Sequence, residues 1–181
     1  LEEFDLLEQL YTTVTTADII HKFNVVERLF RHSLFDGTPL WELIEKHYSD
    51  SRCEQLLQSR RHVYLTTTCL QTERLTVFTN HPHPRTPAGY DLVRLQDPDQ
   101  LRRAVLASAS QPVFMAPVKI NARVPGARHP HRQYVDGGVL QYAGIEMAID
   151  QGADEILTIL HSTSQEGIAE EEFTGLLPIL R

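Results

Sequence analysis

The first segment of the chain has apolar residues three or four positions apart. This spacing places them on one face of a helix, so the sequence predicts a helix within residues 2–23, although the threonines among residues 12–16 weaken its middle. The apolar positions that define this face are Phe4, Leu7, Leu10, Tyr11 and Val14.

Further helices are predicted from capping signals. Thr38-Pro39 and Asp97-Pro98 each combine a capping side chain with a proline that suits the first helical turn. Gly152 ends the last periodic segment. The helices expected from these signals and from periodicity cover residues 24–30, 38–47, 49–57, 97–109 and 143–151.

The pattern changes in the middle of the chain to short runs rich in Val, Thr, Tyr and Phe. Residues 63–70 and 74–79 form two such runs, and the short link between them predicts a β-hairpin. Residues 113–118 lead into another strand, residues 134–136 end one, and residues 153–160 are typical of a buried strand. The order of helices and strands predicts an α/β fold.

The composition is that of one folded domain. The 181 residues are 41% hydrophobic and 23% charged, which is near the average for globular proteins. The net charge of -7 and the scattering of Lys and Arg argue against a nucleic-acid partner. No apolar run is long enough for a transmembrane helix. Cys53 and Cys69 define no disulfide framework, so we expect reduced thiols in a cytoplasmic protein.

The candidate chemistry centres on Asp136, which ends an apolar strand and is followed by Gly137 and Gly138. A carboxylate at the end of a strand projects into the crevice above the sheet, and paired glycines let the backbone turn and leave room for a ligand. The alternative is a turn aspartate that caps the helix after it. No acidic residue follows two positions later, which argues against an aspartate-nucleophile phosphotransferase with bound magnesium.

Three segments in a fixed order carry a family resemblance. Residues 107–112 form an Ala-Ser-x-x-x-Pro segment, residues 136–138 an Asp-Gly-Gly motif, and residues 152–154 a Gly-Ala-Asp that precedes an apolar run. This succession resembles the C-terminal half of a patatin-like phospholipase domain, and residues 40–44 and 65–79 resemble its preceding helix and hairpin. The resemblance implies a three-layer α/β/α sandwich with a largely parallel sheet.

The resemblance also implies a function and a missing half of the active site. Patatin-like enzymes hydrolyse lipid acyl esters with a Ser-Asp dyad, so Asp136 is expected to be the general base. The nine glycines form neither a Gly-x-Ser-x-Gly elbow nor a glycine-rich oxyanion loop. Residues 1–181 are therefore expected to be the C-terminal portion of one patatin-like domain, incomplete on its N-terminal side and inactive on esters by itself.

The resemblance implies that the substrate is a lipid or another acyl ester and that the protein makes peripheral contact with a membrane. The family chemistry requires no metal or cofactor. Arg123, Arg128 and Arg132 are candidates for contact with anionic lipid headgroups. The alternative is a non-catalytic acyl-lipid-binding or protein-interaction module on the same scaffold. A Gly-x-Ser-x-Gly segment upstream in the full-length protein would favour the hydrolase.

Other candidate residues have simpler interpretations. Ser108 and Ser110 lack the strand-turn-helix elbow of a catalytic nucleophile, and we expect them to close a helix and line the pocket floor. Residues 139–143 depart from the family pattern of Asn or Ala followed by Pro, which puts the local shape of the crevice in question. Apolar side chains at helical spacing are candidates for an acyl pocket or a lid, although such positions are more often core; they are Phe35, Trp41, Leu43, Ile44 and Tyr48.

Histidines occur in two His-Pro-His segments, at residues 81–83 and 129–131. In a strand this spacing would put both imidazoles on one face, as in a zinc site, but the intervening proline indicates loops. His161 is interpreted as structural, because the Ser-Asp family uses no catalytic histidine.

Overall fold

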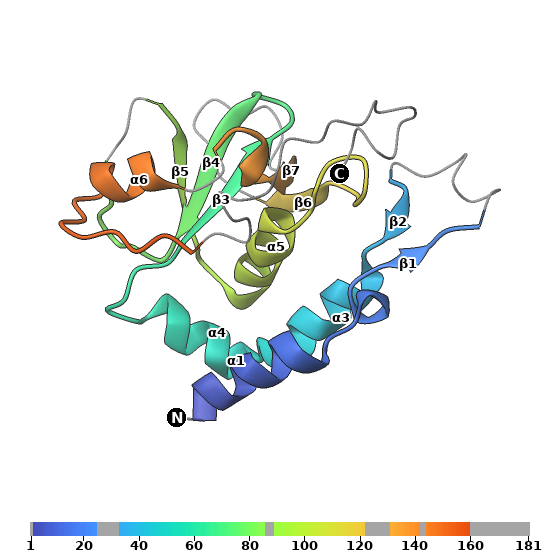
Figure 1. Cartoon of the computed structure of the whole chain (residues 1–181). Helices are drawn as coiled ribbons and strands as arrows, with labels where there is room; N and C mark the ends of the chain where they lie inside the picture. The colour runs from blue at the N-terminus through green and yellow to red at the C-terminus, as the bar shows by residue number, and fades with distance from the viewer. Residues whose placement is uncertain (1, 25–32, 86–88, 122–130, 142–143, 160–181) are drawn as a thin grey trace, which may run out of the picture.

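The computed structural model describes residues 2–24, 33–85, 89–121, 131–141 and 144–159 (Figure 1). Its helices are α1 (Glu2–Thr13), α3 (Thr38–His47), α4 (Asp50–Leu57), α5 (Pro98–Ser108) and α6 (Ile145–Asp150), with the 3-10 helices η1 (Thr16–Asp18) and η2 (Gly137–Val139). Its strands are β1 (His21–Lys22), β2 (Phe35–Asp36), β3 (Tyr64–Cys69), β4 (Arg74–Thr79), β5 (Asp91–Arg94), β6 (Val118–Asn121) and β7 (His131–Asp136).

The main sheet has five strands in the order β5-β4-β3-β7-β6, and β1 pairs separately with β2. The α/β fold expected from the sequence is confirmed. The expectation of a largely parallel sheet is wrong for the part of the chain described, because β4 and β5 are its one parallel pair. The tight link between β3 and β4 reverses the chain direction, whereas parallel neighbours need a longer crossover such as the one before β5.

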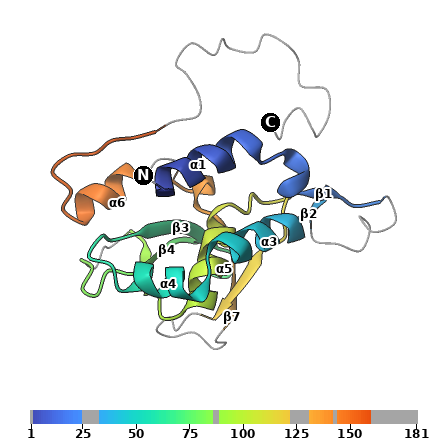
Figure 2. The same cartoon turned by 90° about the horizontal axis from the view of Figure 1, so that it is seen from below.

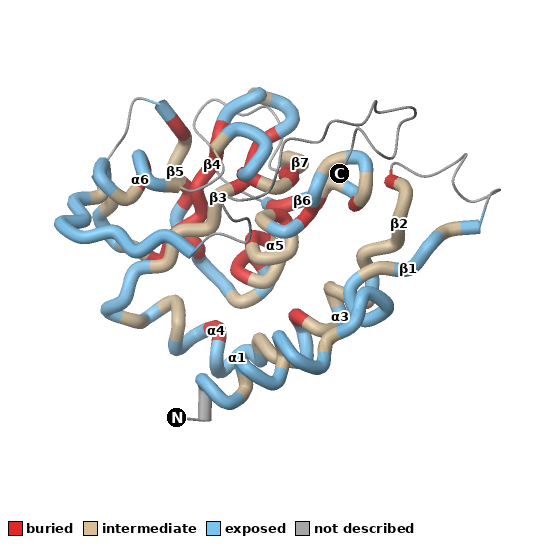
Figure 3. The backbone as a smooth tube through the Cα atoms, in the orientation of Figure 1, coloured by how far each residue is buried: buried red, intermediate tan, exposed pale blue. Residues whose placement is uncertain are grey.

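Helices cover both faces of this sheet. Phe78 and Val77 are adjacent in β4 and therefore point to opposite faces. Phe78 belongs to an apolar cluster with Leu101 of α5, and Val77 to a second cluster with Met147 of α6. Figure 2 shows α5 close to the sheet, with α3 and α4 beside it. Buried residues concentrate in the strands and in α5, whereas α1 and α6 are largely exposed (Figure 3).

The predicted capping signals account for the helices on the α5 side. The Asp97 carboxylate accepts the Gln100 N–H at 2.8 Å, and Pro98 occupies the first turn of α5. Ser49 caps α4 by accepting the Arg52 N–H. At α3 the capping residue is Gly37 rather than the predicted Thr38, because the Asp36 carboxylate binds both the amide and the hydroxyl of Thr38.

Helix α1 is shorter than the predicted segment 2–23. It ends at Thr13, where the Thr12 and Thr13 hydroxyls bind the carbonyls of Glu8 and Gln9 in the preceding turn. The apolar face predicted there is only partly buried, since Phe4 is 75% exposed. The helix predicted at residues 24–30 lies almost entirely outside the described residues.

The strand predicted at residues 153–160 is wrong for its described part, residues 153–159. These residues form no regular structure, and Leu157 is 90% exposed. An apolar run becomes a buried strand only when neighbouring strands bind its backbone groups and a second layer covers its side chains. None of the five strands of the main sheet pairs with this segment. The preceding helix is confirmed as α6, and Gly152 follows it with a φ of 91°.

Candidate functional site

Asp136 occupies the last position of β7, as predicted, and its backbone is held from two sides. The register of the sheet places it beside Thr67 of β3. Its N–H donates to the carbonyl of Ser110 at 2.9 Å, and its carbonyl accepts the hydroxyl of Thr68 at 3.1 Å. The aspartate is thus mounted on a rigid strand end between β3 and the segment that follows α5.

The Asp136 carboxylate is half-buried and uses one of its two oxygens locally. Oδ1 accepts the Gly138 N–H at 2.8 Å and so caps η2, which agrees with the capping interpretation of this residue. Among the described residues, none donates a hydrogen bond to Oδ2. One carboxylate oxygen fixes the orientation of the group while the other stays available to a proton donor.

The two glycines after Asp136 serve different purposes. A Cβ atom on Gly137 would lie 2.6 Å from the backbone carbonyl carbon of Thr66, so this position has no room for a side chain. A Cβ atom on Gly138 would lie 3.3 Å from Asp136 Oδ1. Neither glycine has a positive φ. Glycine is therefore needed here because a side chain would not fit, and not because the backbone is left-handed.

Ser110 is buried beneath this site, and its hydroxyl donates to the Leu106 carbonyl at 2.7 Å. It lies on the wall of a hollow of about 470 Å³ that also includes Trp41, Arg103 and Met115. The Arg103 guanidinium lies 5.4 Å from the centroid of the Trp41 ring. Ser110 therefore closes α5 and lines a pocket, which is the structural role expected of it, and its hydroxyl proton is engaged with the backbone.

The segment that follows Ser110 carries backbone strain. Val113 has a φ of 72°, a conformation that β-branched residues rarely adopt. The carbonyls of Val113 and Phe114 accept the N–H groups of Leu34 and Phe35 at 2.8 and 2.9 Å, and the rings of Phe35 and Phe114 stack. These contacts hold the turn in place, so the residues directly after the Ala-Ser-x-x-x-Pro segment are fixed to Leu34 and Phe35.

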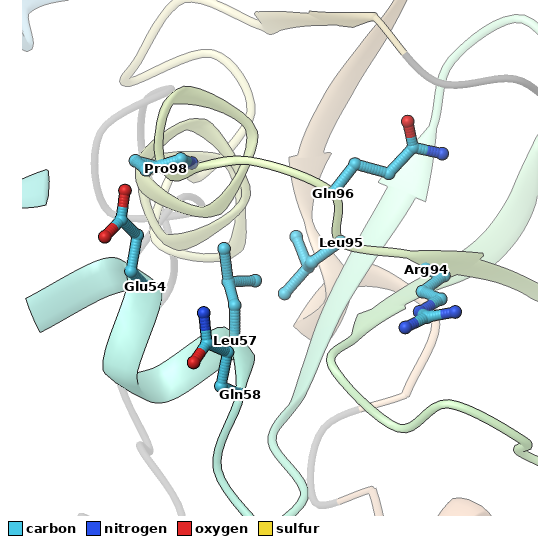
Figure 4. A pocket seen from close by; sticks show the side chains of 7 residues that line it. All are labelled: Glu54, Leu57, Gln58, Arg94, Leu95, Gln96 and Pro98. Atoms are coloured by element: carbon cyan, nitrogen blue, oxygen red, sulfur yellow. The ribbon is translucent and has the colours of Figure 1, made fainter. Parts of the chain in front are cut away.

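A hollow of about 500 Å³ lies elsewhere, between α4, the end of β5 and the start of α5. Figure 4 shows Leu57 and Leu95 on facing sides of it, with Glu54 near Pro98. Asp136 does not line this hollow. The candidate chemistry therefore lies away from this hollow.

The described histidines provide no metal centre. The His81 ring packs against the His62 ring at a tilt of 34°, with ring centroids 3.7 Å apart, and its Nδ1 lies 3.2 Å from the Tyr64 hydroxyl. Desolvation and the neighbouring imidazoles of His62 and His83 lower the pKa of His81. Across the described ranges, no three His, Cys, Asp or Glu side chains gather in a way that could hold a metal ion. The candidates His129 and His161 lie outside those ranges.

The remaining candidates have mixed outcomes. Cys53 and Cys69 are free and buried, and burial raises the pKa of the Cys53 thiol. Arg132 lies in β7, whereas Arg123 and Arg128 fall outside the described residues. Ile44 is buried, and Trp41 and Tyr48 are half-buried.

No described helix is both long enough and apolar enough to span a membrane.

Sequence reasoning missed the threonines of β3 as partners of Asp136. Thr66 approaches Gly137, Thr67 pairs in register with Asp136, and Thr68 binds its carbonyl. The run Thr66-Thr67-Thr68 indicated a strand, but it carried no signal of which strand would lie beside it.

The fold and site define an α/β domain with a carboxylate mounted at the end of a strand and followed by a glycine pair. Residues 2–149 match the patatin-like phospholipase family, and the chain belongs to this family. A comparison with curated proteins gave no match. Membership of the family supports a lipid hydrolase as the class of activity.

Proposed function

We propose that the protein is a lipid acyl hydrolase, a phospholipase A or carboxylic ester hydrolase, that uses a Ser-Asp dyad. This chain carries the aspartate of the dyad, Asp136, and forms the C-terminal portion of one patatin-like domain. The observation that supports this proposal most strongly is the carboxylate of Asp136, fixed through Oδ1 by the Gly138 N–H. The family match over residues 2–149 supports the lipid substrate class.

The chemistry follows from the available oxygen of Asp136. In the proposed reaction Oδ2 accepts the proton of a serine hydroxyl supplied by residues outside this sequence, while the serine oxygen attacks the ester carbonyl carbon. The protonated carboxyl then gives this proton to the departing alkoxide, which leaves an acyl-serine. Asp136 next takes a proton from water as that water attacks the acyl group, and the proton returns to serine as the fatty acid leaves.

Two apolar side chains support a lipid substrate beside Asp136. Val139 and Leu140 directly follow the glycine pair and are 55% and 53% exposed. Exposed apolar residues next to a reactive carboxylate suit an acyl chain or a lipid surface. We propose peripheral membrane contact at this end of β7, with the active site facing the lipid.

Ester hydrolysis by the full-length protein tests the proposal. Asp136→Asn is expected to lower kcat by roughly 10²- to 10⁴-fold, the usual contribution of a general base. Asp154→Asn is the matched control, because Asp154 is exposed and follows α6. Equal rates for the two variants would remove Asp136 from the chemistry. A folded full-length protein that binds acyl lipids without hydrolysing them would favour the non-catalytic binding module.

A further inference from the structure

A third hollow, of about 430 Å³, lies between α1, α4 and the segment that leads into β3. This volume is within the usual range for small-molecule pockets. Its lining includes Leu6, Leu10, Arg52, Leu56 and Arg61. No lining residue belongs to β7 or η2, so this hollow is separate from Asp136.

One side of this pocket is apolar and only partly covered by protein. Leu6 and Leu10 of α1 and Leu56 of α4 are half-buried, which leaves part of their surface facing the hollow. Covering apolar surface that is otherwise in contact with water is favourable, roughly in proportion to its area. A single acyl chain laid along α1 would cover it.

The lining of the same pocket carries positive charge. Arg52 and Arg61 belong to it, and no Asp or Glu does. The hollows of about 500 and 470 Å³, and two smaller ones beside α5 and α6, each include at least one carboxylate. The whole chain has a net charge of -7, whereas this wall has arginines and no carboxylate. Its positive charge suits an anionic ligand.

Hydrogen bonds from a buried side chain hold the backbone of the pocket wall in place. Asn80 is 4% exposed, and both the nitrogen and the oxygen of its side-chain amide bind backbone groups between Leu56 and Val63. Its Nδ2 donates to the carbonyls of Leu56 and Arg61 at 2.7 and 3.1 Å, and its Oδ1 accepts the Val63 N–H at 2.8 Å. These bonds fix the backbone that carries Arg61. In the described chain, no carboxylate forms an ion pair with Arg52 or Arg61.

We propose that this pocket binds one free fatty acid, with its acyl chain against Leu6, Leu10 and Leu56 and its carboxylate at Arg61. Bidentate pairing with a carboxylate suits the planar guanidinium group. The inference goes beyond the proposed hydrolase, because binding here requires neither a nucleophile nor Asp136.

Calorimetric titration of the full-length protein with dodecanoate tests this inference, with dodecyltrimethylammonium as the cationic ligand of equal chain length. We expect one dodecanoate per chain and much weaker binding of the cation. Arg61→Gln should weaken dodecanoate binding roughly tenfold. Arg60→Gln, at an exposed neighbour that does not line the pocket, should bind like the native protein.

A second pair of variants tests the apolar wall. Leu10→Glu places a carboxylate on that wall and should abolish binding, whereas Tyr11→Glu changes a residue that is 75% exposed and should not affect it. Equal binding of the cation, or equal affinities of the Arg61 and Arg60 variants, would overturn the inference. Asp136→Asn should bind dodecanoate normally; a loss of binding there would assign the fatty acid to the hydrolase site and overturn a separate pocket.

Discussion

Gly137 lies so close to β3 that a Cβ atom placed on it would be 2.6 Å from the carbonyl carbon of Thr66. Gly137→Ala must therefore push apart two strands that meet at the candidate site. We expect a loss of roughly 1–3 kcal/mol in the free energy of unfolding, as for other overpacked positions. Urea denaturation monitored by circular dichroism measures this loss.

Gly89→Ala is the matched control for this prediction, because a Cβ atom on Gly89 would have no neighbour within 4 Å. It should change the free energy of unfolding by less than about 0.5 kcal/mol. If Gly137→Ala were as stable as Gly89→Ala, the close packing of η2 against β3 would be wrong.

Tyr134 provides a second prediction, because its ring is fully buried and its hydroxyl has no hydrogen-bond partner among the described residues. A buried polar group without a partner is destabilising. Tyr134→Phe removes this group and keeps the edge-to-face contact with Phe78. We expect it to raise the free energy of unfolding by about 1 kcal/mol near neutral pH. A loss of stability would show that the hydroxyl has a partner.

The same residue makes stability depend on alkaline pH. Burial raises the pKa of Tyr134 above its ordinary value of 10.0, so the folded protein keeps this proton after the unfolded chain has lost it. This group therefore leaves the free energy of unfolding independent of pH below about pH 10.0 and lowers it as the pH rises above 10.0. Burial also raises the pKa values of Tyr48, Tyr64 and Tyr90, so alkaline sensitivity should persist in Tyr134→Phe but be smaller. Urea denaturation at about pH 8 and about pH 10.5 compares the two proteins.

Val113 provides a third prediction through its φ of 72°. Asparagine tolerates this backbone conformation far better than a β-branched residue. Val113→Asn should therefore raise the free energy of unfolding by about 1 kcal/mol. Val139→Asn is the control, since Val139 is similarly exposed and has no positive φ. Equal thermal midpoints for these two variants would argue against strain at Val113.

Local signals predicted much of the scaffold around the candidate site. The capped start of α5, the hairpin of β3 and β4, and the strand that ends at Asp136 each follow from residues close together in the sequence. Caps, turns and period-two runs depend on neighbouring residues, and for this reason the sequence alone specifies them.

Non-local pairing was not predictable in the same way. Residues 153–159 have the composition of a buried strand, but whether they form one depends on a neighbour that local patterning cannot identify. The position of Thr66 against Gly137 depends likewise on β3 lying beside β7, across a separation of about 70 residues in the chain. The strand end and the glycine pair made Asp136 a candidate, and the family resemblance implied its role as general base, whereas its partners in β3 emerged only from the fold.

Fluorophosphonate labelling with mass-spectrometric mapping tests whether Asp136 activates a serine in the full-length protein. We expect the label on one serine upstream of Leu1, with labelling much slower in Asp136→Asn and unchanged in Asp154→Asn. Absence of label on the intact, folded protein, or equal labelling rates in the two variants, would contradict the Ser-Asp dyad.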